Sequence, residues 1–490
     1  MKMRTKHLIV MIMTTWLALT AAQRTAASDL VIISDPHLLA PSLITPGTAI
    51  ERADAVETKM MAMSDDIMSA LADSVIAVHP RVVLITGDLT HNGERASHER
   101  MLYHLQRLAQ HGISALVIPG NHDCNNPYAV SYDGDSTSPV TTVTREEFAQ
   151  LYRDHGYGEA SLRDTSSLSY CCEPIDGIVL IAIDSNMDEK NLLTACGDSV
   201  NTYHNAGQVK AETLQWVVQQ ANKAREQGKQ VIAMMHHHLV PHFDKQEQLL
   251  ANYIVKNHRE VARQLMQAGV HAIFTGHLHV TDAATLYADD SSDSITEVAT
   301  GSAICYPFAM REATWDNDKK QMEISTRWLN ATTACPTLRE QGRQRIIKAT
   351  PGIASILSGR AWNKLGDRVG QIKKMLEMGG GEVHVPDSPQ QATQLALRHL
   401  SEVLSRTMLA IVEGNENEKD VEALVDQGKQ GVRAMIQEVA PEQADNLWDF
   451  FLQGVYPRLE PMIRSVLQDR NAVGTTAESR TDDLTLTIPL

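Results

Sequence analysis

Five short segments of the chain place carboxylate, amide and imidazole side chains where apolar runs end. They are Ser34-Asp35-Pro36-His37, Gly87-Asp88, Gly120-Asn121-His122-Asp123, Met235-His236-His237-His238 and Gly276-His277-Leu278-His279. Each follows a run of Val, Ile, Leu, Ala, Met or Phe that is the length of a strand. The carboxyl ends of strands in open sheets are where ligands gather. We therefore expect the side chains of the five segments to converge on one site.

This mixture of side chains is typical of a site for divalent cations. Alternate side chains of an extended segment point the same way, so His277 and His279 can face one metal or two neighbouring metals. Oxygen and imidazole ligands together suit zinc, iron or manganese, whereas calcium prefers sites made of oxygen alone. Taken singly, Asp35 or Asp88 also fits an ordinary turn in which the carboxylate binds backbone amides. The recurrence of the pattern in five segments favours the metal site.

The elements that must position these ligands are buried strands alternating with helices. The apolar runs predict strands at 30–33, 82–85, 115–118, 178–183, 230–235, 271–274, 295–300 and 321–328. Amphipathic stretches predict helices at 53–79, 95–111, 208–226 and 253–267. Continuous apolar strands separated by helices indicate a sheet covered on both faces. Residues 125–144 are rich in Asn, Pro, Ser and Gly and predict a long loop at the rim of the site.

Taken in order, the five motifs resemble those of the calcineurin-like metallophosphoesterases, over residues 29–335. The resemblance implies an α/β fold, a metallophosphoesterase-type β-sandwich flanked by helices (αββα). Beyond it, apolar residues recur every three or four positions and predict an additional C-terminal all-helical region. The expected domains are a signal peptide at 1–28, the metallophosphoesterase domain at 29–338, the helical domain at 339–470 and a disordered tail at 471–490.

The resemblance also implies a role for each motif residue. The implied metal ligands are Asp35, His37 and His279 for the first ion, Asn121, His236 and His277 for the second, and Asp88 bridging both. His122 would stabilise or protonate the leaving oxygen, and Asp123 would orient His122. In the triple histidine, His236 directly follows the strand and is preferred as the ligand, with His237 as the alternative. His91 and His237 are further candidates for contact with substrate.

The implied function is metal-dependent hydrolysis of a small phosphate ester. Two divalent ions, of manganese, iron or zinc, would share a hydroxide that attacks phosphorus. The segment Gly87-Asp88-Leu-Thr, followed by Asn92-Gly93, is similar to the branch with cyclic-nucleotide and glycerophospho-diesterases, so a phosphodiester is slightly favoured. His91 stands where purple acid phosphatases carry tyrosine, which argues against their coloured iron site. The alternatives are a phosphomonoesterase with the same site, or a non-catalytic scaffold with a helical interaction module.

The N-terminus and the charge indicate where the protein acts. Lys2, Arg4 and Lys6 precede an apolar run at 8–19 and small residues at 21–28, which is the layout of a signal peptide. We expect a secreted or periplasmic protein with no stable membrane span after removal of the signal; the alternative is that the segment stays as an uncleaved anchor. In an exported protein the six cysteines can form disulfides. A net charge of −16 does not favour nucleic acid as a partner. The helical region is expected to dock on the catalytic domain or to recruit a partner.

Overall fold

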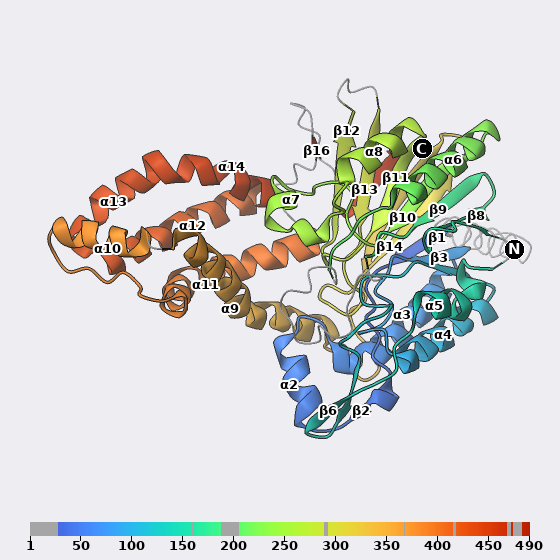
Figure 1. Cartoon of the computed structure of the whole chain (residues 1–490), viewed down its shortest axis with the longest axis horizontal. Coiled ribbons are helices and arrows are strands. Elements are labelled where there is room, and N and C mark those ends of the chain that lie inside the picture. Colours follow the sequence, from blue (N-terminus) through green and yellow to red (C-terminus); the bar gives the residue numbers. More distant parts are fainter. Residues whose placement is uncertain are drawn as a thin grey trace, which may run out of the picture.

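The computed structural model describes residues 28–158, 161–187, 205–288, 293–366, 368–414, 418–467, 472–473 and 483–490. Apart from Ser28, the predicted signal peptide lies outside these ranges, as does Cys196. In the described part of the chain, two large sheets pack face to face with helices on both outer faces (Figure 1). This is the predicted αββα arrangement, which is confirmed.

The first large sheet has six strands and carries three of the ligand segments. Its order is β17 (Thr485–Pro489), β15 (Gln321–Trp328), β14 (Ala309–Asp316), β1 (Leu30–Ile33), β3 (Val82–Ile85) and β4 (Ser114–Val117). Strands β1, β3 and β4 are parallel, with Ile33 opposite Ile85 and Ile85 opposite Val117. Asp35, Asp88 and Asn121 therefore follow neighbouring strand ends at one edge of the sheet.

The second large sheet has eight strands and carries the histidine segments. Its order is β16 (Ala472–Val473), β12 (Asp282–Tyr287), β13 (Ser294–Ala299), β11 (Val270–Thr275), β10 (Gln230–Met235), β9 (Ile178–Ile183), β8 (Tyr170–Ile175) and β7 (Leu162–Arg163). Strands β9, β10, β11 and β13 run parallel. The strands that precede the five ligand segments all lie within one residue of their predicted ends.

The core lies between the sheets and beneath the helices. In β9, Ile178, Leu180 and Ala182 face the core between the sheets, whereas Val179 and Ile181 face a second core. This alternation explains why β9 is apolar at every position. The outer core is closed by α6 (Ala211–Glu226) and α8 (His258–Gln267), while α3 (Ser64–Val78) and α4 (Arg95–Gln110) cover the first sheet.

Two local predictions differ from the structure. The single helix expected at 53–79 is divided into α2 (Thr48–Val56), a short 3₁₀ turn and α3, because the backbone N–H of Met60 donates to the carbonyl of Ile304 at 2.9 Å. The loop expected at 125–144 contains a hairpin of β5 (Val130–Asp133) and β6 (Ser136–Pro139), which pairs with β2 (Ile44–Thr45). Tyr132 anchors this small sheet in an apolar cluster of its own.

The helical region projects from the catalytic domain as an arm (Figure 1). Its helices are α9 (Leu338–Leu365), α10 (Arg368–Met378), α11 (Pro389–Glu413), α12 (Glu418–Val439), α13 (Ala444–Phe450) and α14 (Tyr456–Leu467). The base of the arm is joined to the catalytic core, because Leu338 and Ile346 of α9 and Leu409 and Val412 of α11 are buried in it. None of the helices in the described ranges is both long enough and apolar enough to cross a membrane.

Cys171, Cys172, Cys305 and Cys335 are free thiols, so the structure does not show the expected disulfides for these four cysteines. Cys171 and Cys172 are neighbours on β8, and their side chains pack into the two different cores. Burial raises the pKa of these two thiols to about 11 and about 12. They act as small apolar side chains in the core.

The last residues of the chain form a strand, contrary to the tail predicted to be disordered from residue 471. β17 pairs antiparallel with β15, with Ile488 opposite Met322 and Leu486 opposite Ile324. Leu486 and Ile488 are buried in the main core. The polar composition of the segment concealed this alternation, because every second residue of an edge strand faces solvent.

Ile488→Asp is expected to lower the melting temperature by at least about 5 °C, because it places a carboxylate in the apolar core. Thr487→Asp is the matched control, since Thr487 is exposed on the other face of the same strand. Thermal unfolding of both variants measures the difference. Equal melting temperatures for the two variants would show that the segment is not part of the folded core.

Candidate metal centre

The side chains from the five ligand segments meet at the edge shared by the two sheets. Three groups of potential ligand atoms cluster there: Asp35 with His37 and His279, His37 with Asp88 and His122, and Asp88 with His236 and His277. Asp88 belongs to two of these groups, and its Oδ2 lies 3.4 Å from the Nε2 atoms of both His37 and His236. The structure therefore brings together the residues predicted for two cations, with Asp88 between them.

The first group has the geometry of a cation site. The Nε2 atoms of His37 and His279 lie 3.1 Å apart, and His279 Nε2 lies 3.3 Å from Asp35 Oδ1. Two imidazole nitrogens on one zinc ion are separated by about 3.3 Å when the Zn–N distances are about 2.0–2.1 Å. Asp35 Oδ1 is buried and accepts no well-formed hydrogen bond from the described residues. These atoms fit a divalent cation as their common partner.

In the group of Asp88, His236 and His277, hydrogen bonds behind the two imidazoles fix the orientation of each ring. His236 Nδ1 donates to the carbonyl of Thr86 at 2.8 Å, and His277 Nε2 donates to the carbonyl of Asn252 at 3.2 Å. Each bond leaves the other ring nitrogen as a lone-pair donor, as in many metal sites. His236 Nε2 lies 2.9 Å from Asn121 Oδ1, so the two predicted ligand atoms are adjacent.

Tight turns at the strand ends direct the proposed ligand side chains toward the metal centre. Asp35, His37, Asp88, His277 and His279 all have positive φ angles, between 36° and 69°. This left-handed conformation is unfavourable for residues with a Cβ atom and is concentrated at functional sites. Neighbouring glycines make room for these turns: a Cβ atom on Gly120 would lie 2.2 Å from Asp88 Oδ1, and one on Gly276 would lie 1.8 Å from Ser34 Oγ.

The charges at the centre also suit cations. Burial tends to raise the pKa of Asp88, but His236, His122 and His37 outweigh burial and hold that pKa well below its usual range. Burial lowers the pKa of His277 to about 3, and burial, with help from Lys59, also lowers that of His37. Asp88 is therefore anionic and these two imidazoles are neutral, which is the protonation state required of metal ligands. Burial also lowers the pKa of His236, but Asp88 outweighs it and raises that pKa to about 9 in the absence of metal, so a cation bound there would displace a proton.

His122 stands beside the metal ligands and is held from behind. Its Nδ1 donates to the carbonyl of His91 at 2.7 Å and lies 2.9 Å from Asn92 Oδ1, while its Nε2 lies 4.0 Å from Asp88 Oδ2. Sequence reasoning gave Asn92 no contact with His122. The His91 carbonyl could not be foreseen, because a backbone group leaves no mark in the sequence.

Asp123 is placed differently from its expected role. Its carboxylate accepts hydrogen bonds from the backbone N–H groups of Leu89, Thr90 and Gly120 at 2.8–3.1 Å. Its contacts tie the Asp88 loop to the Asn121 loop, while the groups that orient His122 through Nδ1 are those of His91 and Asn92. Asp123 thus positions the backbone of both loops.

His91 and His237, the two expected substrate contacts, are buried. His91 Nε2 lies 3.5 Å from the hydroxyl of Tyr132, and burial is the main cause that lowers its pKa to about 3. His237 Nδ1 lies 2.9 Å from Ser185 Oγ, with its ring against that of His277. Both side chains support the ligand loops from within the protein. A substrate therefore cannot reach either of them.

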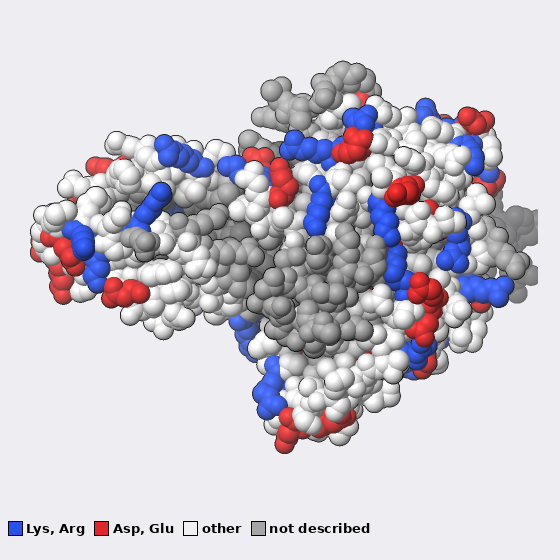
Figure 2. Space-filling model, viewed as in Figure 1, with Lys and Arg blue, Asp and Glu red and all other residues white. Residues whose placement is uncertain are grey.

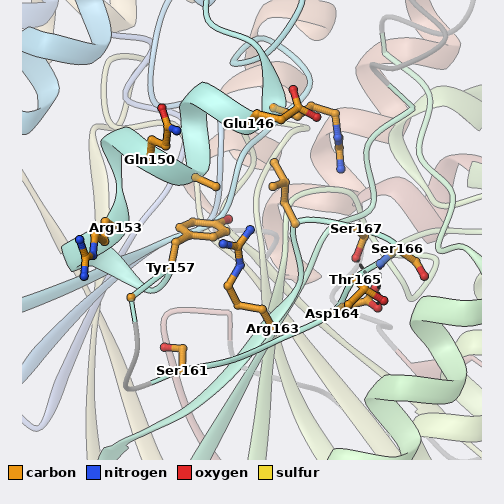
Figure 3. Close-up of a pocket in the computed structure, with 14 residues that line it drawn as sticks. Glu146, Gln150, Arg153, Tyr157, Ser161, Arg163, Asp164, Thr165, Ser166 and Ser167 are labelled. Atoms are coloured by element: carbon orange, nitrogen blue, oxygen red, sulfur yellow. Dashed lines mark hydrogen bonds between the residues drawn. The ribbon is translucent and has the colours of Figure 1, made fainter.

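A cavity lies apart from the metal centre. It has a volume of about 950 Å³ and is lined mainly by α5 (Arg145–Leu151) and residues 161–168 (Figure 3). Arg145, Arg153 and Arg163 line it, but Arg145 is paired with the Asp184 carboxylate. None of the predicted metal ligands lines this cavity. The predicted metal ligands are therefore collected at the sheet edge and not in this cavity.

The packed sheets and the paired ligand groups define the class of protein as a metal-dependent phosphoesterase, with ligands that fit two divalent ions. Residues 29–281 match the family described as calcineurin-like phosphoesterase. This match covers more than half of the chain, which therefore belongs to the calcineurin-like phosphoesterase family.

Individual relatives are more distant. A protein of Vesicomyosocius okutanii named "Probable cyclic nucleotide phosphodiesterase" is 41% identical over 63 residues, which are 12% of this chain and 24% of that protein. The match thus spans about a quarter of the relative's length.

Among solved structures, a dimetal phosphatase from Danio rerio has 14% identity and a TM-score of 0.41, covering 61% of this chain and 95% of its own. A purple acid phosphatase from yellow lupin (Lupinus luteus) has 11% identity and a TM-score of 0.38, covering 61% of this chain and 51% of its own.

Proposed function

We propose that this protein hydrolyses small phosphodiesters with two divalent cations bound at the sheet edge. The observation that carries this proposal is the pair of ligand groups that share Asp88, with His122 beside them. Asp35, His37 and His279 would hold one ion and Asn121, His236 and His277 the other. When bound, the cations supply an activated water and offset the charge of the phosphate.

The protein's own residues then have separate tasks. Asp88 holds the two ligand groups together, and its Oδ1 accepts the backbone N–H of His122 at 2.8 Å. His122 Nε2, which lies 4.0 Å from Asp88 Oδ2, would deliver a proton to the leaving oxygen, while Nδ1 binds the His91 carbonyl and Asn92. The side chains of His122 and His279 are 18% and 22% exposed, whereas those of His37, Asp88 and His236 are at most 2% exposed. Substrate therefore approaches past His122 and His279.

Among phosphate esters, we propose that the protein prefers diesters to monoesters. It is supported by the segment Gly87-Asp88-Leu-Thr with Asn92-Gly93, and by the name of the curated relative, a probable cyclic nucleotide phosphodiesterase. The signal-like N-terminus supports action outside the cytoplasm, in a secreted or periplasmic location. Lys, Arg, Asp and Glu are intermixed over the face shown in Figure 2, which suits a small substrate better than a polyanion.

The test combines metal counting with hydrolysis. The chain beginning at Ser28 is stripped of metal, reloaded with manganese or zinc, and assayed with bis(p-nitrophenyl) phosphate and p-nitrophenyl phosphate. We expect about two ions at the sheet edge and faster cleavage of the diester, with loss of activity on chelation.

Cleavage of the monoester alone would replace the proposal by a phosphomonoesterase with the same site. Ions at the sheet edge with neither activity would mean that the substrate class is wrong. A folded protein that takes up no metal there would remove the proposal altogether. A fluorescence or circular-dichroism spectrum of the stripped chain establishes that the fold is intact in each case.

A further inference from the structure

A second cluster of metal-ligand side chains lies next to the ligand loops but belongs to neither proposed ion. It consists of His238 and His242, in the loop after β10, and Glu297, within β13. Asp282, the first residue of β12, lies beside it. The side chains of His238, His242 and Glu297 are at most 1% exposed. Such groups are rarely buried together without a partner that balances them.

The three buried side chains converge on a common point. Glu297 Oε1 lies 3.6 Å from His238 Nδ1 and 3.2 Å from His242 Nε2. The ligand atoms of all three residues lie within 4.8 Å of one another. Two imidazoles and one glutamate form the ligand set of several zinc sites.

The far side of each side chain faces another polar group. His238 Nε2 donates to the carbonyl of Gly276 at 3.0 Å, which leaves Nδ1 with a lone pair directed at the cluster. His242 Nδ1 lies 3.1 Å from Asp282 Oδ2, an arrangement of carboxylate behind imidazole that is common in metal sites. Glu297 Oε2 accepts the backbone N–H groups of Leu239 and Val240 at 2.7 and 2.6 Å.

The hydrogen bonds inside the cluster are incomplete. Neither ring nitrogen of His242 makes a well-formed hydrogen bond to a described residue, although both are buried. Gln246 Nε2 lies 3.5 Å from His238 Nδ1, at the limit of a hydrogen bond, and the Thr275 hydroxyl donates to Glu297 Oε1. A buried imidazole that approaches two carboxylates without good hydrogen-bond geometry calls for a different partner.

We propose that His238 Nδ1, His242 Nε2 and Glu297 Oε1 bind a third divalent cation of the zinc type, with Asp282 supporting His242 from outside. The alternative occupant is a proton: burial lowers the pKa of His242, but Asp282 and Glu297 outweigh it and raise that pKa to about 10 in the absence of metal. The geometry favours the cation, because a proton needs the aligned hydrogen bonds that His242 lacks.

The third ion would brace the catalytic loops. His238 follows the ligand His236 by two residues, and the Gly276 carbonyl that holds His238 directly precedes the ligand His277. Glu297 binds the backbone of the same loop after β10. The ion would thus cross-link β13 to the ends of β10 and β11, and its role would be structural.

Metal analysis of the full chain loaded with zinc tests the proposal directly. Wild type is expected to hold about three zinc ions per chain and His242→Gln about two. His104→Gln is the matched control, because His104 is equally buried and also pairs with a carboxylate, that of Asp65, at 2.8 Å. It should keep about three.

A crystallographic anomalous difference map at the zinc edge locates the ions without relying on any variant. We expect one peak among His238, His242 and Glu297, which should persist in Asp88→Asn even where ions at the sheet edge are lost. Absence of this peak in the zinc-loaded wild type, with His242→Gln holding as many ions as wild type, would overturn the proposal. The cluster would then be an imidazolium held between two carboxylates.

Discussion

Asp88→Asn is expected to lower phosphoester hydrolysis by at least about 1,000-fold and to reduce the metal content below two ions at the sheet edge. Asparagine keeps the size of the side chain and an oxygen for the His122 backbone N–H, which the Asp88 Oδ1 accepts at 2.8 Å. It replaces the anionic Oδ2, which lies 3.4 Å from both His37 and His236, by a neutral group or a hydrogen-bond donor. Two cations can no longer share a carboxylate there.

The measurement pairs metal analysis with turnover of bis(p-nitrophenyl) phosphate. The matched control is Asp73→Asn, since the Asp73 side chain is 67% exposed and pairs with Arg107 at the surface. The melting temperature is also expected to fall in Asp88→Asn, because His236, His122 and His37 hold the pKa of Asp88 well below its usual range and its charge therefore stabilises the fold at neutral pH. A circular-dichroism spectrum checks that the variant is folded at the assay temperature. Full metal content with wild-type turnover would show that Asp88 does not bridge the ions.

His122→Ala is expected to lower turnover by about 100- to 10,000-fold while both ions at the sheet edge remain bound. The structure distinguishes His122 from the proposed ligands. Its Nδ1 is held by the His91 carbonyl and Asn92, and its side chain is 18% exposed beside Asp88. A general acid matters most when the leaving group is a poor one. The loss should therefore be greater for a diester with an unsubstituted phenol or an alcohol as leaving group than for one with p-nitrophenol.

A series of phenyl phosphodiesters with graded leaving groups measures this difference, with metal content determined on the same samples. His111→Ala serves as control, because His111 is exposed at the end of α4. Loss of a metal ion in His122→Ala would contradict the assignment of His122 as a proton donor and make it a ligand. An equal loss of rate across the series would indicate a role in binding phosphate.

Substitution of Asn92 tests the hydrogen bonds that hold His122, with a smaller expected loss of activity. Its Oδ1 lies 2.9 Å from His122 Nδ1 and also accepts a hydrogen bond from Asn126 Nδ2 at 3.2 Å. The carbonyl of His91 still holds His122 when Asn92 is changed. Asn92 is therefore a positioning residue, and its loss should affect catalysis less than the loss of His122.

The sequence alone predicted which side chains would meet at the sheet edge and which strands would deliver them. Asp35, Asp88, Asn121, His236 and His277 could be singled out because each follows an apolar run within a few residues, and strand ends meet at one edge of a sheet. The all-helical region could be identified because its apolar residues repeat with the helical period. Both features depend only on the order of side chains along the chain, so they can be predicted without knowledge of distant contacts.

Only the tertiary structure decided how those side chains act. The left-handed backbone at Asp88 and His279, and the carbonyls that orient His122 and His236, are backbone properties with no sequence signature. The return of β17 to the catalytic sheet and the contacts of Glu297 with the loop after β10 join residues at least 57 positions apart. Such pairings are set by packing of the whole fold, because local propensity and periodicity carry no information about which distant segment a strand or side chain will meet.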